Sequence, residues 1–526
     1  MRPRTALRLS GAVCCWLLLA GAPAAHGAGD AERGFPLIQA YNAVSQGGET
    51  QSFGIVRDAK GLLYLGNLAG VLVFDGAWWR EIPIGKEKTA FSLGSDAAGR
   101  VAVGGFDELG LLAPDDHGTL RFTSFLFLLP PEERDLGQVM QTLPAADGFL
   151  FVTSGKLLAW DGTRITILAR FPGGRPFATA FQAGPETYLW SRDGLARIAG
   201  GRIEPVPGGA MFRGRRIDMV LPAGDRPEQG LLVSVRDEGL FLFAQGNAVP
   251  FAPEASRWTS AKRLMPGAGR RLPDGRWALG SILGGLLLLR PDGAVDQVID
   301  SAVGLPDDFV KAVVLDHEGS LWLALNNGLA KVEVASPVSV IDRRSGLQGS
   351  VYNLARHRGD LWVGTAAGLF TVVHTAGPAD RGLPFRMSAV PGLPPAAWSL
   401  LSVDQDLLVG TAFGLYRVTG GGKAEPVPGL PQQTIYALAR SRMDPRRVWM
   451  GGEEGLSAIR RDGTGWHFEG RIDAIRHEVR SLVETEGGTV WCGVTGEGAV
   501  GIEIAPSSGA PGTLLSLRTR RVPDSD

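Results

Sequence analysis

The chain has 526 residues, which is more than one ordinary domain contains, and 44% of them are hydrophobic, which is enough for a packed core. Its formal net charge is −1, so no global charge favours nucleic acid or an anionic membrane as a partner. The 74 glycines cut the apolar sequence into short runs rich in Val, Leu and Trp, which argues against helical repeats and favours β-strands.

Residues 1–27 have the pattern of a secretion signal. Three arginines precede an apolar stretch from Leu9 to Ala22, and small residues follow it, so we expect cleavage after Ala24 or Gly27. An uncleaved membrane anchor is the alternative, but this stretch is shorter than the span of about 20 residues that a bilayer requires. We therefore expect a periplasmic protein. Its mature chain keeps only Cys492, which we expect to be a small buried hydrophobic residue.

A glycine, usually followed by a hydrophobic residue, recurs along the mature chain. The steps between copies are 39 to 46 residues, which indicates an array of repeated units. Each unit reads as a strand, an Asp/Gly turn, a second strand, the glycine, a third strand and a looser fourth strand. Four short antiparallel strands in about 43 residues match the size of a propeller blade. The eleven copies are Gly70, Gly110, Gly155, Gly194, Gly239, Gly285, Gly328, Gly368, Gly414, Gly455 and Gly498.

The repeats divide into two arrays, so the predicted fold is an all-β double propeller. The phrase at 336–342 is similar to the phrase at 34–40 and follows it by 301 residues, which is seven periods of 43. We expect a seven-bladed ring at 34–335, whose opening strand completes its last blade and removes the exposed edge. Only four repeats follow at 336–505. We expect them to form an incomplete second propeller, followed by a flexible tail at 506–526.

Tryptophan is part of the repeat. Five tryptophans fall at one strand position of their units, and we expect them to fill the core between blades. Trp398 breaks this register and lies where an inner strand begins, so it is the better aromatic candidate for contact with a ligand. The five repeat tryptophans are Trp277, Trp322, Trp362, Trp449 and Trp491.

Two of the repeats carry a recognisable motif. Glu318–Leu329 and Arg358–Leu369 resemble the two-component regulator propeller repeat. Phe53–Asp58 and Val103–Gly110 are similar to segments in the sensor half of bacterial periplasmic ligand-binding receptors. The resemblance extends over residues 34–505 and is weakest near blades three to five.

This resemblance implies a periplasmic sensor head. In the family, two seven-bladed propellers precede an immunoglobulin-like tyrosine-rich domain, a membrane helix and an intracellular output domain. The sequence departs from that pattern, because it contains no second membrane segment, no tyrosine-rich module and no kinase or nucleotide-binding motif. We therefore expect a sensor head that acts with a separate membrane signalling protein, or as a homo-oligomer, and that binds no nucleic acid.

The sequence contains no catalytic constellation. The histidines of the mature chain lie in turns or lack partners at metal-ligand spacing, so we expect no enzyme activity, no metal site and no cofactor. Two alternatives stay open. One is a propeller enzyme, a lyase or hydrolase, acting on polysaccharide. The other is a protein-interaction scaffold whose open four-repeat array takes up strands of a partner.

Ligand binding is expected at the mouth of the first ring, where loops lead into the innermost strands of a propeller. Several residues in these loops are cationic although the chain is nearly neutral, which suits a small anionic or polyhydroxylated ligand, including an oligosaccharide. The candidate ligand-binding residues are Gln51, Lys88, Gln138, Arg175, Arg213, Arg215, Arg216, Lys262 and Asp308, together with Trp398.

Overall fold

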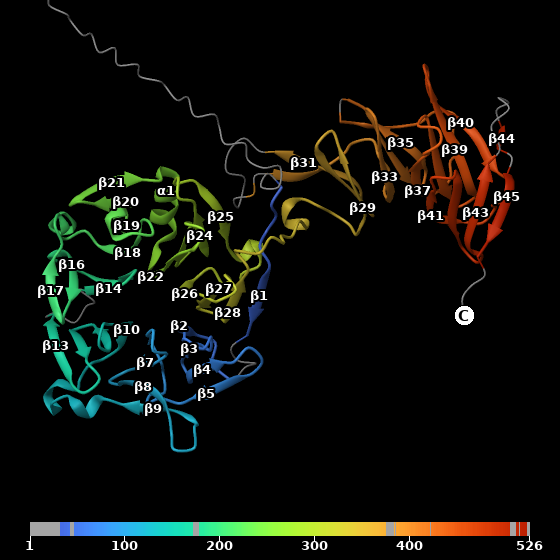
Figure 1. The fold of residues 1–526 in the computed structure, drawn as a ribbon. Helices are drawn as coiled ribbons and strands as arrows, with labels where there is room; N and C mark the ends of the chain where they lie inside the picture. Colours follow the sequence, from blue (N-terminus) through green and yellow to red (C-terminus); the bar gives the residue numbers. More distant parts are fainter. Residues whose placement is uncertain are drawn as a thin grey trace, which may run out of the picture.

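The computed structural model describes residues 32–42, 47–171, 178–374, 383, 385–420, 422–504, 512–514 and 516–522. These residues form eleven sheets, which we number as blades 1 to 11 in the order of their inner strands. All their strand pairs are antiparallel except the outermost pair of blade 10, which is parallel. In Figure 1 the ring of blades 1 to 7 lies to the left and the second array extends to the right. The leader at 1–27 and Arg175 lie outside the described residues.

Each blade of the first ring has four strands, ordered from the inner strand outward. Blades 1 to 4 are β2 (Ser52–Arg57), β3 (Leu63–Asn67), β4 (Gly70–Phe74), β5 (Trp79–Ile82); β6 (Ser92–Ser95), β7 (Val101–Gly104), β8 (Leu109–Pro114), β9 (Leu120–Ser124); β10 (Val139–Pro144), β11 (Phe149–Thr153), β12 (Lys156–Trp160), β13 (Ile165–Arg170); and β14 (Ala178–Ala183), β15 (Glu186–Ser191), β16 (Gly194–Ala199), β17 (Arg202–Pro205). Blades 5 to 7 are β18 (Ile217–Pro222), β19 (Leu231–Val235), β20 (Gly239–Ala244), β21 (Asn247–Phe251); β22 (Leu264–Arg271), β23 (Trp277–Ser281), β24 (Leu286–Leu289), β25 (Val295–Ile299); and β26 (Val310–Leu315), β27 (Leu321–Leu325), β28 (Leu329–Val332), β1 (Ile38–Tyr41).

The seven blades close into a ring. Each inner strand contacts the inner strand of the next blade, and β26 of blade 7 contacts β2 of blade 1. The N-terminal strand β1 pairs antiparallel with β28, with Ile38 opposite Val332, so blade 7 takes its outer strand from the start of the chain. The predicted closure of the ring by its opening strand is therefore confirmed. It covers the outer edge of β28, which would otherwise be unpaired.

The recurring glycine has a conformational cause. It lies where the second strand of a blade turns into the third, and all copies except Gly110 and Gly155 have positive φ, for example 142° at Gly70 and 100° at Gly455. Glycine adopts this left-handed region at no steric cost, whereas a side chain is disfavoured there. The repeat therefore preserves glycine at a turn that the blade geometry requires.

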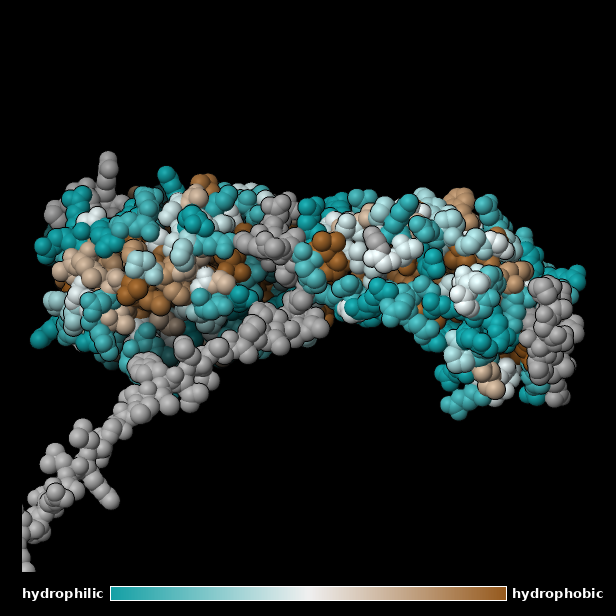
Figure 2. Space-filling view, turned by 90° about the horizontal axis from the view of Figure 1, so that it is seen from above, coloured by the Kyte–Doolittle hydropathy of each residue, from teal (hydrophilic) through white to brown (hydrophobic). Residues whose placement is uncertain are grey.

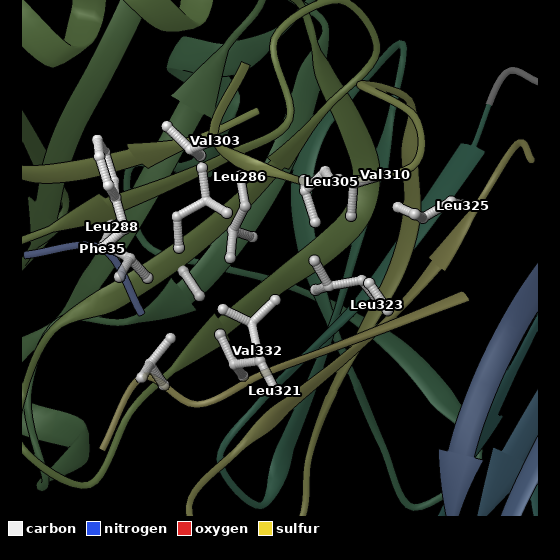
Figure 3. Close-up of a cluster of buried hydrophobic side chains, with 14 of the residues drawn as sticks. Phe35, Leu286, Leu288, Val303, Leu305, Val310, Leu321, Leu323, Leu325 and Val332 are labelled. Atoms are coloured by element: carbon white, nitrogen blue, oxygen red, sulfur yellow. The ribbon is translucent and has the colours of Figure 1, made fainter. Parts of the chain in front are cut away.

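The N-terminal segment also fixes the core between blades 6 and 7. Phe35 is buried among leucines and valines of these two blades (Figure 3). Its backbone forms an isolated bridge with Val340, at the start of the second array, through two hydrogen bonds of 2.9 and 2.8 Å. The two similar phrases of the sequence thus lie side by side, and the first anchors the connection between the arrays.

The second array has four blades. They are β29 (Val351–His357), β30 (Asp360–Thr365), β31 (Gly368–His374), β32 (Phe385–Ala389); β33 (Ala397–Val403), β34 (Asp406–Thr411), β35 (Gly414–Val418), β36 (Ala424–Pro426); β37 (Ile435–Arg440), β38 (Arg447–Gly452), β39 (Gly455–Asp462), β40 (Gly465–Ile472), β44 (Gly512–Leu514); and β41 (Val479–Glu484), β42 (Thr489–Val494), β43 (Gly498–Ile504), β45 (Ser516–Arg521).

This array is open. Its inner strands contact one another in the order β29, β33, β37 and β41, and within the described residues β41 makes no comparable contact with β29. The expectation of a flexible tail at 506–526 is wrong for 516–521. That segment forms β45, which pairs with β43 as the outer strand of blade 11. The physical reason is that a fourth strand satisfies the outer backbone groups of β43, as it does in the other blades.

The repeat tryptophans fill the space between blades, as predicted, with two differences. Trp322, Trp362 and Trp449 are at most 8% exposed and point toward the following blade. Trp277 instead packs against blade 5, because it is the first residue of its strand and its side chain faces the other side. Trp491 is only half-buried, since no described blade follows it. Cys492, the neighbour of Trp491, is buried, and desolvation raises the pKa of its thiol to about 12.

One helix interrupts the strand pattern, and the sequence analysis did not anticipate it. Helix α1 (Pro253–Lys262) connects the outer strand of blade 5 to the inner strand of blade 6 and packs on β20. Pro253 is tolerated in the first turn, where its missing N–H has no intrahelical partner in any case. Trp258, which breaks the repeat register, lies on this helix and packs against the core of blades 5 and 6.

A buried histidine lies between the first two blades of the second array. His357 is 5% exposed, and its Nδ1 lies 2.8 Å from Ser402 Oγ across the contact between blades 8 and 9. Burial lowers the pKa of His357, and the charge of Arg358 lowers it further, against the opposing charges of Asp406 and Asp360. The folded array therefore disfavours the protonated imidazole.

We expect the second array to lose stability as the pH falls below the ordinary histidine pKa of about 6.5. Below that pH the unfolded chain binds a proton that the folded chain does not, so this contribution is complete above it and declines toward acid. Unfolding midpoints of the wild type and of His357→Gln, measured across this range, should differ in slope. The exposed His117→Gln control should keep the wild-type slope. An unchanged slope for His357→Gln would contradict the assignment.

Candidate ligand-binding surfaces

The loops that lead into the inner strands lie on one face of the ring, which we call the mouth face. Of the predicted residues on this face, Lys88 and Gln138 are exposed, and Gln51 lies directly before β2, where its carbonyl accepts a hydrogen bond of 2.8 Å from Asn67 Nδ2. Lys262 is the last residue of α1, and Asp308 accepts a 2.6 Å hydrogen bond from the Ser301 amide. Gln51 and Asp308 therefore stabilise their own loops.

Two of the predicted arginines are held by carboxylates. Arg215 makes a bidentate contact with Glu238, at 2.9 and 2.5 Å, and its guanidinium stacks over Phe212 and Phe241. Arg216 lies 3.4 Å from Asp218. The guanidinium groups of Arg215 and Arg216, both predicted to bind ligand, are therefore already engaged by carboxylates of the chain. The partner of Arg215, Glu238, lies 23 residues further along the chain, so the local sequence did not reveal it. The partner of Arg216, Asp218, is only two residues away.

Arg213 differs from its neighbours. It is exposed and, within the described residues, takes part in no ion pair. It lines a cleft of about 720 Å³ on the mouth face, between the outer strands of blades 3 and 4, which we call the mouth cleft. Further lining residues of the mouth cleft are Arg170, Phe171, Ser191, Arg192, Asp193 and Ala210.

The mouth cleft is cationic. Arg170 is paired with Glu133 at 2.7 Å, whereas the exposed guanidinium of Arg213 has no carboxylate partner in the part of the chain that the structure describes. The side of the cleft beside Arg170 is apolar and includes Phe171. An exposed guanidinium beside an apolar wall suits a carboxylate, sulfate or phosphate group carried on a small molecule, because the fork of N–H donors binds such oxygens in pairs.

A second, larger cleft of about 1050 Å³ lies on the opposite face of the ring, between blades 2, 3 and 4. The charged groups along it are mostly paired with one another. Arg100 contacts Asp96 at 2.6 Å, and Arg164 contacts Asp161 at 2.9 Å. Because their charges are already satisfied, these arginines have less to gain from an anionic ligand than Arg213 has.

Bulges in the inner strands form a further surface. In several inner strands one extra residue breaks the pairing with the second strand, and this bulged residue is the second of its strand. In the first ring, bulged Lys311 of blade 7 lies over bulged Phe53 of blade 1, with Nζ 4.4 Å from the ring centroid. Burial lowers the pKa of Lys311 although Asp307 raises it. A cation–π pair thus bridges the blades where the ring closes.

The second array carries a continuous row of such residues, which we call the bulge row. Trp398, the predicted aromatic contact, stacks on Tyr352 with ring centroids 4.3 Å apart and meets Tyr436 edge-on at 5.6 Å. Arg480 lies over the other side of the row, 4.5 Å from the centroid of Tyr436. The row crosses all four inner strands, and Tyr352 is 40% exposed at its end.

Of this row, only Trp398 was predicted from the sequence. A usable signal was present, because an aromatic or cationic residue occupies the second position of the inner strand in most units. The rest of the bulge row was missed because side chains in a regular strand alternate between two faces of the sheet. A bulge adds one residue, and the side chain of that residue then points to neither face.

Clusters of metal-ligating side chains and long apolar helices were sought among the described residues. This part of the chain contains no group of three or more His, Cys, Asp or Glu side chains placed to hold a metal ion. Its one α-helix is too short and too polar to cross a bilayer, and no other described helix is long enough to do so.

Comparison with solved structures supports the fold. The extracellular domain of the hybrid two-component system BT3049 from B. thetaiotaomicron matches 92% of this chain and 67% of that domain, with a TM-score of 0.62 and 15% identity. The corresponding domain of BT4673 from the same organism matches 89% of this chain and 66% of its own length, with a TM-score of 0.43 and 14% identity. This chain thus spans about two thirds of the length of these domains.

The likeness in sequence is much weaker. No family model and no curated protein sequence matches the chain. A streptogramin B lyase structure matches 56% of this chain and 97% of its own length, at 13% identity and a TM-score of 0.43, which supports no inference about activity. The match to the BT3049 domain therefore shows the propeller fold that the repeat motif implied, and it shows the fold alone.

Proposed function

We propose that this chain is the periplasmic ligand-binding head of a two-component-type signalling system. Its fold over most of its length is similar to that of an extracellular domain of a hybrid two-component system, at a TM-score of 0.62. The leader pattern at 1–27 directs the chain to the periplasm. A membrane signalling protein would receive the signal and carry it to the output.

The ligand is proposed to be a small anionic or polyhydroxylated molecule, such as an acidic oligosaccharide, that binds in the mouth cleft. The observation that carries this assignment is the exposed Arg213, which has no carboxylate partner among the described residues although Arg215 and Arg216 nearby are both paired. An unpaired guanidinium in a concave site is a ready partner for an anionic oxygen. The proposal assigns binding to this chain and no catalysis.

A thermal-shift screen of the mature chain tests the proposal. Acidic oligosaccharides should raise the melting temperature in a saturable way, because a ligand that binds only the native state stabilises it by about 2.7 kcal/mol at 100 times its Kd. Neutral oligosaccharides, amino acids and nucleotides serve as comparison classes. A shift confined to neutral ligands, or none with any ligand, would contradict an anion site. Release of shortened products from a polysaccharide would instead favour the enzyme alternative.

A further inference from the structure

The seven inner strands of the first ring surround its axis (Figure 1), and their sequences carry an excess of positive charge. They contain one carboxylate, Asp218, which already accepts two hydrogen bonds from Arg236. Charged side chains are ordinary on the outside of the molecule, much of which is hydrophilic in Figure 2, but enclosed charges cost free energy unless they are paired. The cationic residues of these strands are Arg57, Arg270, Arg271 and Lys311.

Two of these cations have partners, and two have none among the described residues. Arg271 is paired with Asp225 at 2.5 Å, and Lys311 lies over an aromatic ring near the mouth face. Arg57 and Arg270 take part in no ion pair and no side-chain hydrogen bond within the part of the chain that the structure describes. Their guanidinium groups are therefore the uncompensated charges of the inner strands.

Arg57 and Arg270 approach the same strand from opposite sides. Arg57 ends β2 of blade 1 and lies opposite Leu63, which is buried against blade 7. Arg270 lies opposite Ala278 in blade 6, and Ala278 is likewise buried against blade 7. Because directly opposite residues of an antiparallel pair project to the same face, both arginine side chains extend toward β26. They lie near the ends of their inner strands, on the side of the ring away from the mouth face.

A long bulge in β22 crosses the ring on the mouth side of these arginines. Residues 265–268 stand opposite Gly280 alone, whereas β2 and β26 each have a single bulged residue. The bulge extends to blade 3, because a β-carbon at Gly267 would lie 3.4 Å from Gln141 Nε2. Gln141 is itself fixed by two hydrogen bonds with Ala180 of blade 4, of 3.0 and 2.9 Å. An anion would therefore approach the two arginines from the face opposite the mouth.

The surroundings of Arg270 combine enclosure with access to solvent. Its side chain is exposed, yet desolvation lowers the pKa of its guanidinium, and the positive charge of Arg57 lowers that pKa further. A group that is both solvated and surrounded by protein lies inside the ring rather than on its outer surface. Two like charges in such a place attract an anion, because the low-dielectric walls concentrate their field.

We propose that Arg57 and Arg270 form a second anion-binding site at the axis of the first ring, separate from the mouth cleft. Its ligand is a small anion with several acceptor oxygens, such as a phosphate or a dicarboxylate, held between two guanidinium groups that each bind oxygens in pairs. The anion supplies a counter-charge that the inner strands lack. Binding therefore stabilises the part of the ring where blades 6, 7 and 1 meet.

Calorimetric titration of the mature chain with inorganic phosphate, and separately with succinate, tests this proposal in a chloride buffer of constant ionic strength. We expect saturable binding of at least one of the two anions by the wild type. Arg57→Gln and Arg270→Gln should each weaken it by at least about tenfold, because each removes one of the two guanidinium groups that hold the anion. The control Arg202→Gln, at an exposed arginine on the outer strand of blade 4, should keep the wild-type affinity.

Melting temperatures give a second measurement. In chloride alone Arg270→Gln should melt at or above the wild-type temperature, because it removes one of two like charges, and the anion should then raise its melting temperature less than that of the wild type. Arg213→Glu should keep the binding that depends on Arg57 and Arg270. No saturable binding of either anion, or unchanged affinity in both glutamine variants, would overturn the proposal. Loss of binding in Arg213→Glu alone would also overturn it, and would assign the anion to the mouth cleft.

Discussion

Replacing Trp322 by alanine is expected to destabilise the first ring by about 3 to 5 kcal/mol, as is typical of a large aromatic residue removed from a packed core. Trp322 is 4% exposed and lies between blades 7 and 1, stacked on Tyr41 with ring centroids 5.2 Å apart. Its indole also donates a 3.0 Å hydrogen bond to Asp316. The substitution therefore leaves a cavity at the closure of the ring and removes a hydrogen bond from the Asp316 oxygen, which keeps only the ammonium of Lys331 at 3.7 Å.

Urea unfolding followed by fluorescence and circular dichroism measures this loss. Reaction of Cys492 with a thiol reagent reports the second array separately, because this residue is buried in blade 11. The control is Trp78→Ala, at a tryptophan that is 77% exposed, which should change stability by no more than about 0.5 kcal/mol. Two results would contradict the role of Trp322 in holding the ring closed. One is that Trp322→Ala unfolds both arrays together, and the other is that it lowers the free energy of unfolding by no more than Trp78→Ala does.

Replacing Asp218 by alanine is expected to cost about 3 kcal/mol, the lower end of the range for breaking a buried ion pair. Asp218 is the bulged residue of β18 and is 2% exposed. Its two carboxylate oxygens accept hydrogen bonds of 2.9 and 2.8 Å from Arg236, and Arg216 lies within 3.4 Å. Without the carboxylate, the two guanidinium groups lose the counter-charge that both of them contact. Because both arginines are partly exposed, solvent reduces the penalty.

The unfolding free energy of Asp218→Ala should be compared with that of two other variants. Asp218→Asn keeps the shape and one acceptor oxygen and should lie between the wild type and the alanine variant. Asp292→Ala removes a carboxylate that is 65% exposed and pairs with Arg290 on the surface, and it should have an effect below about 1 kcal/mol. Equal effects of Asp218→Ala and Asp292→Ala would show that burial contributes nothing to the first pair.

Burial raises the pKa of Asp218, although both arginines lower it. This direction indicates that desolvation outweighs the two positive charges, so the carboxylate is not strongly stabilised in its charged form. The contribution of Asp218 to the free energy of unfolding should therefore not increase as the pH rises above the ordinary pKa of an aspartate side chain. The large cost of Asp218→Ala arises from the arginines that it leaves behind.

The sequence predicted the blades well because the unit is local. The glycine at positive φ, the Asp/Gly turn and the interblade tryptophan all lie within one unit of about 43 residues, so one chain segment contains every signal for one blade. The role of the opening strand β1 in completing the last blade of the ring was predicted from two similar sequence segments that lie 301 residues apart. Trp277 fills the space between blades as predicted, but on the side of blade 5, because one residue of difference in a strand moves a side chain to the opposite face.

The candidate site was predicted less well, because charge pairing is not local. Arg213, Arg215 and Arg216 look alike in the sequence, yet only Arg213 lacks a carboxylate partner among the described residues. The carboxylate that holds Arg215 belongs to Glu238, and the pairing forms only when blade 5 folds. The bulge row was missed for a related reason, since four separate units must stack before their second residues come into contact.

Titration of the mature chain with an acidic oligosaccharide, by calorimetry, tests the central claim most directly when Arg213→Glu is compared with Arg202→Glu. Arg202 is exposed at the start of β17, at the other end of blade 4, so both variants make the same change of charge. We predict saturable binding by the wild type and by Arg202→Glu, weakened at high salt, and a loss of at least about tenfold in affinity for Arg213→Glu. Equal affinities for the two variants, or no saturable binding by the wild type, would contradict a ligand site in the mouth cleft.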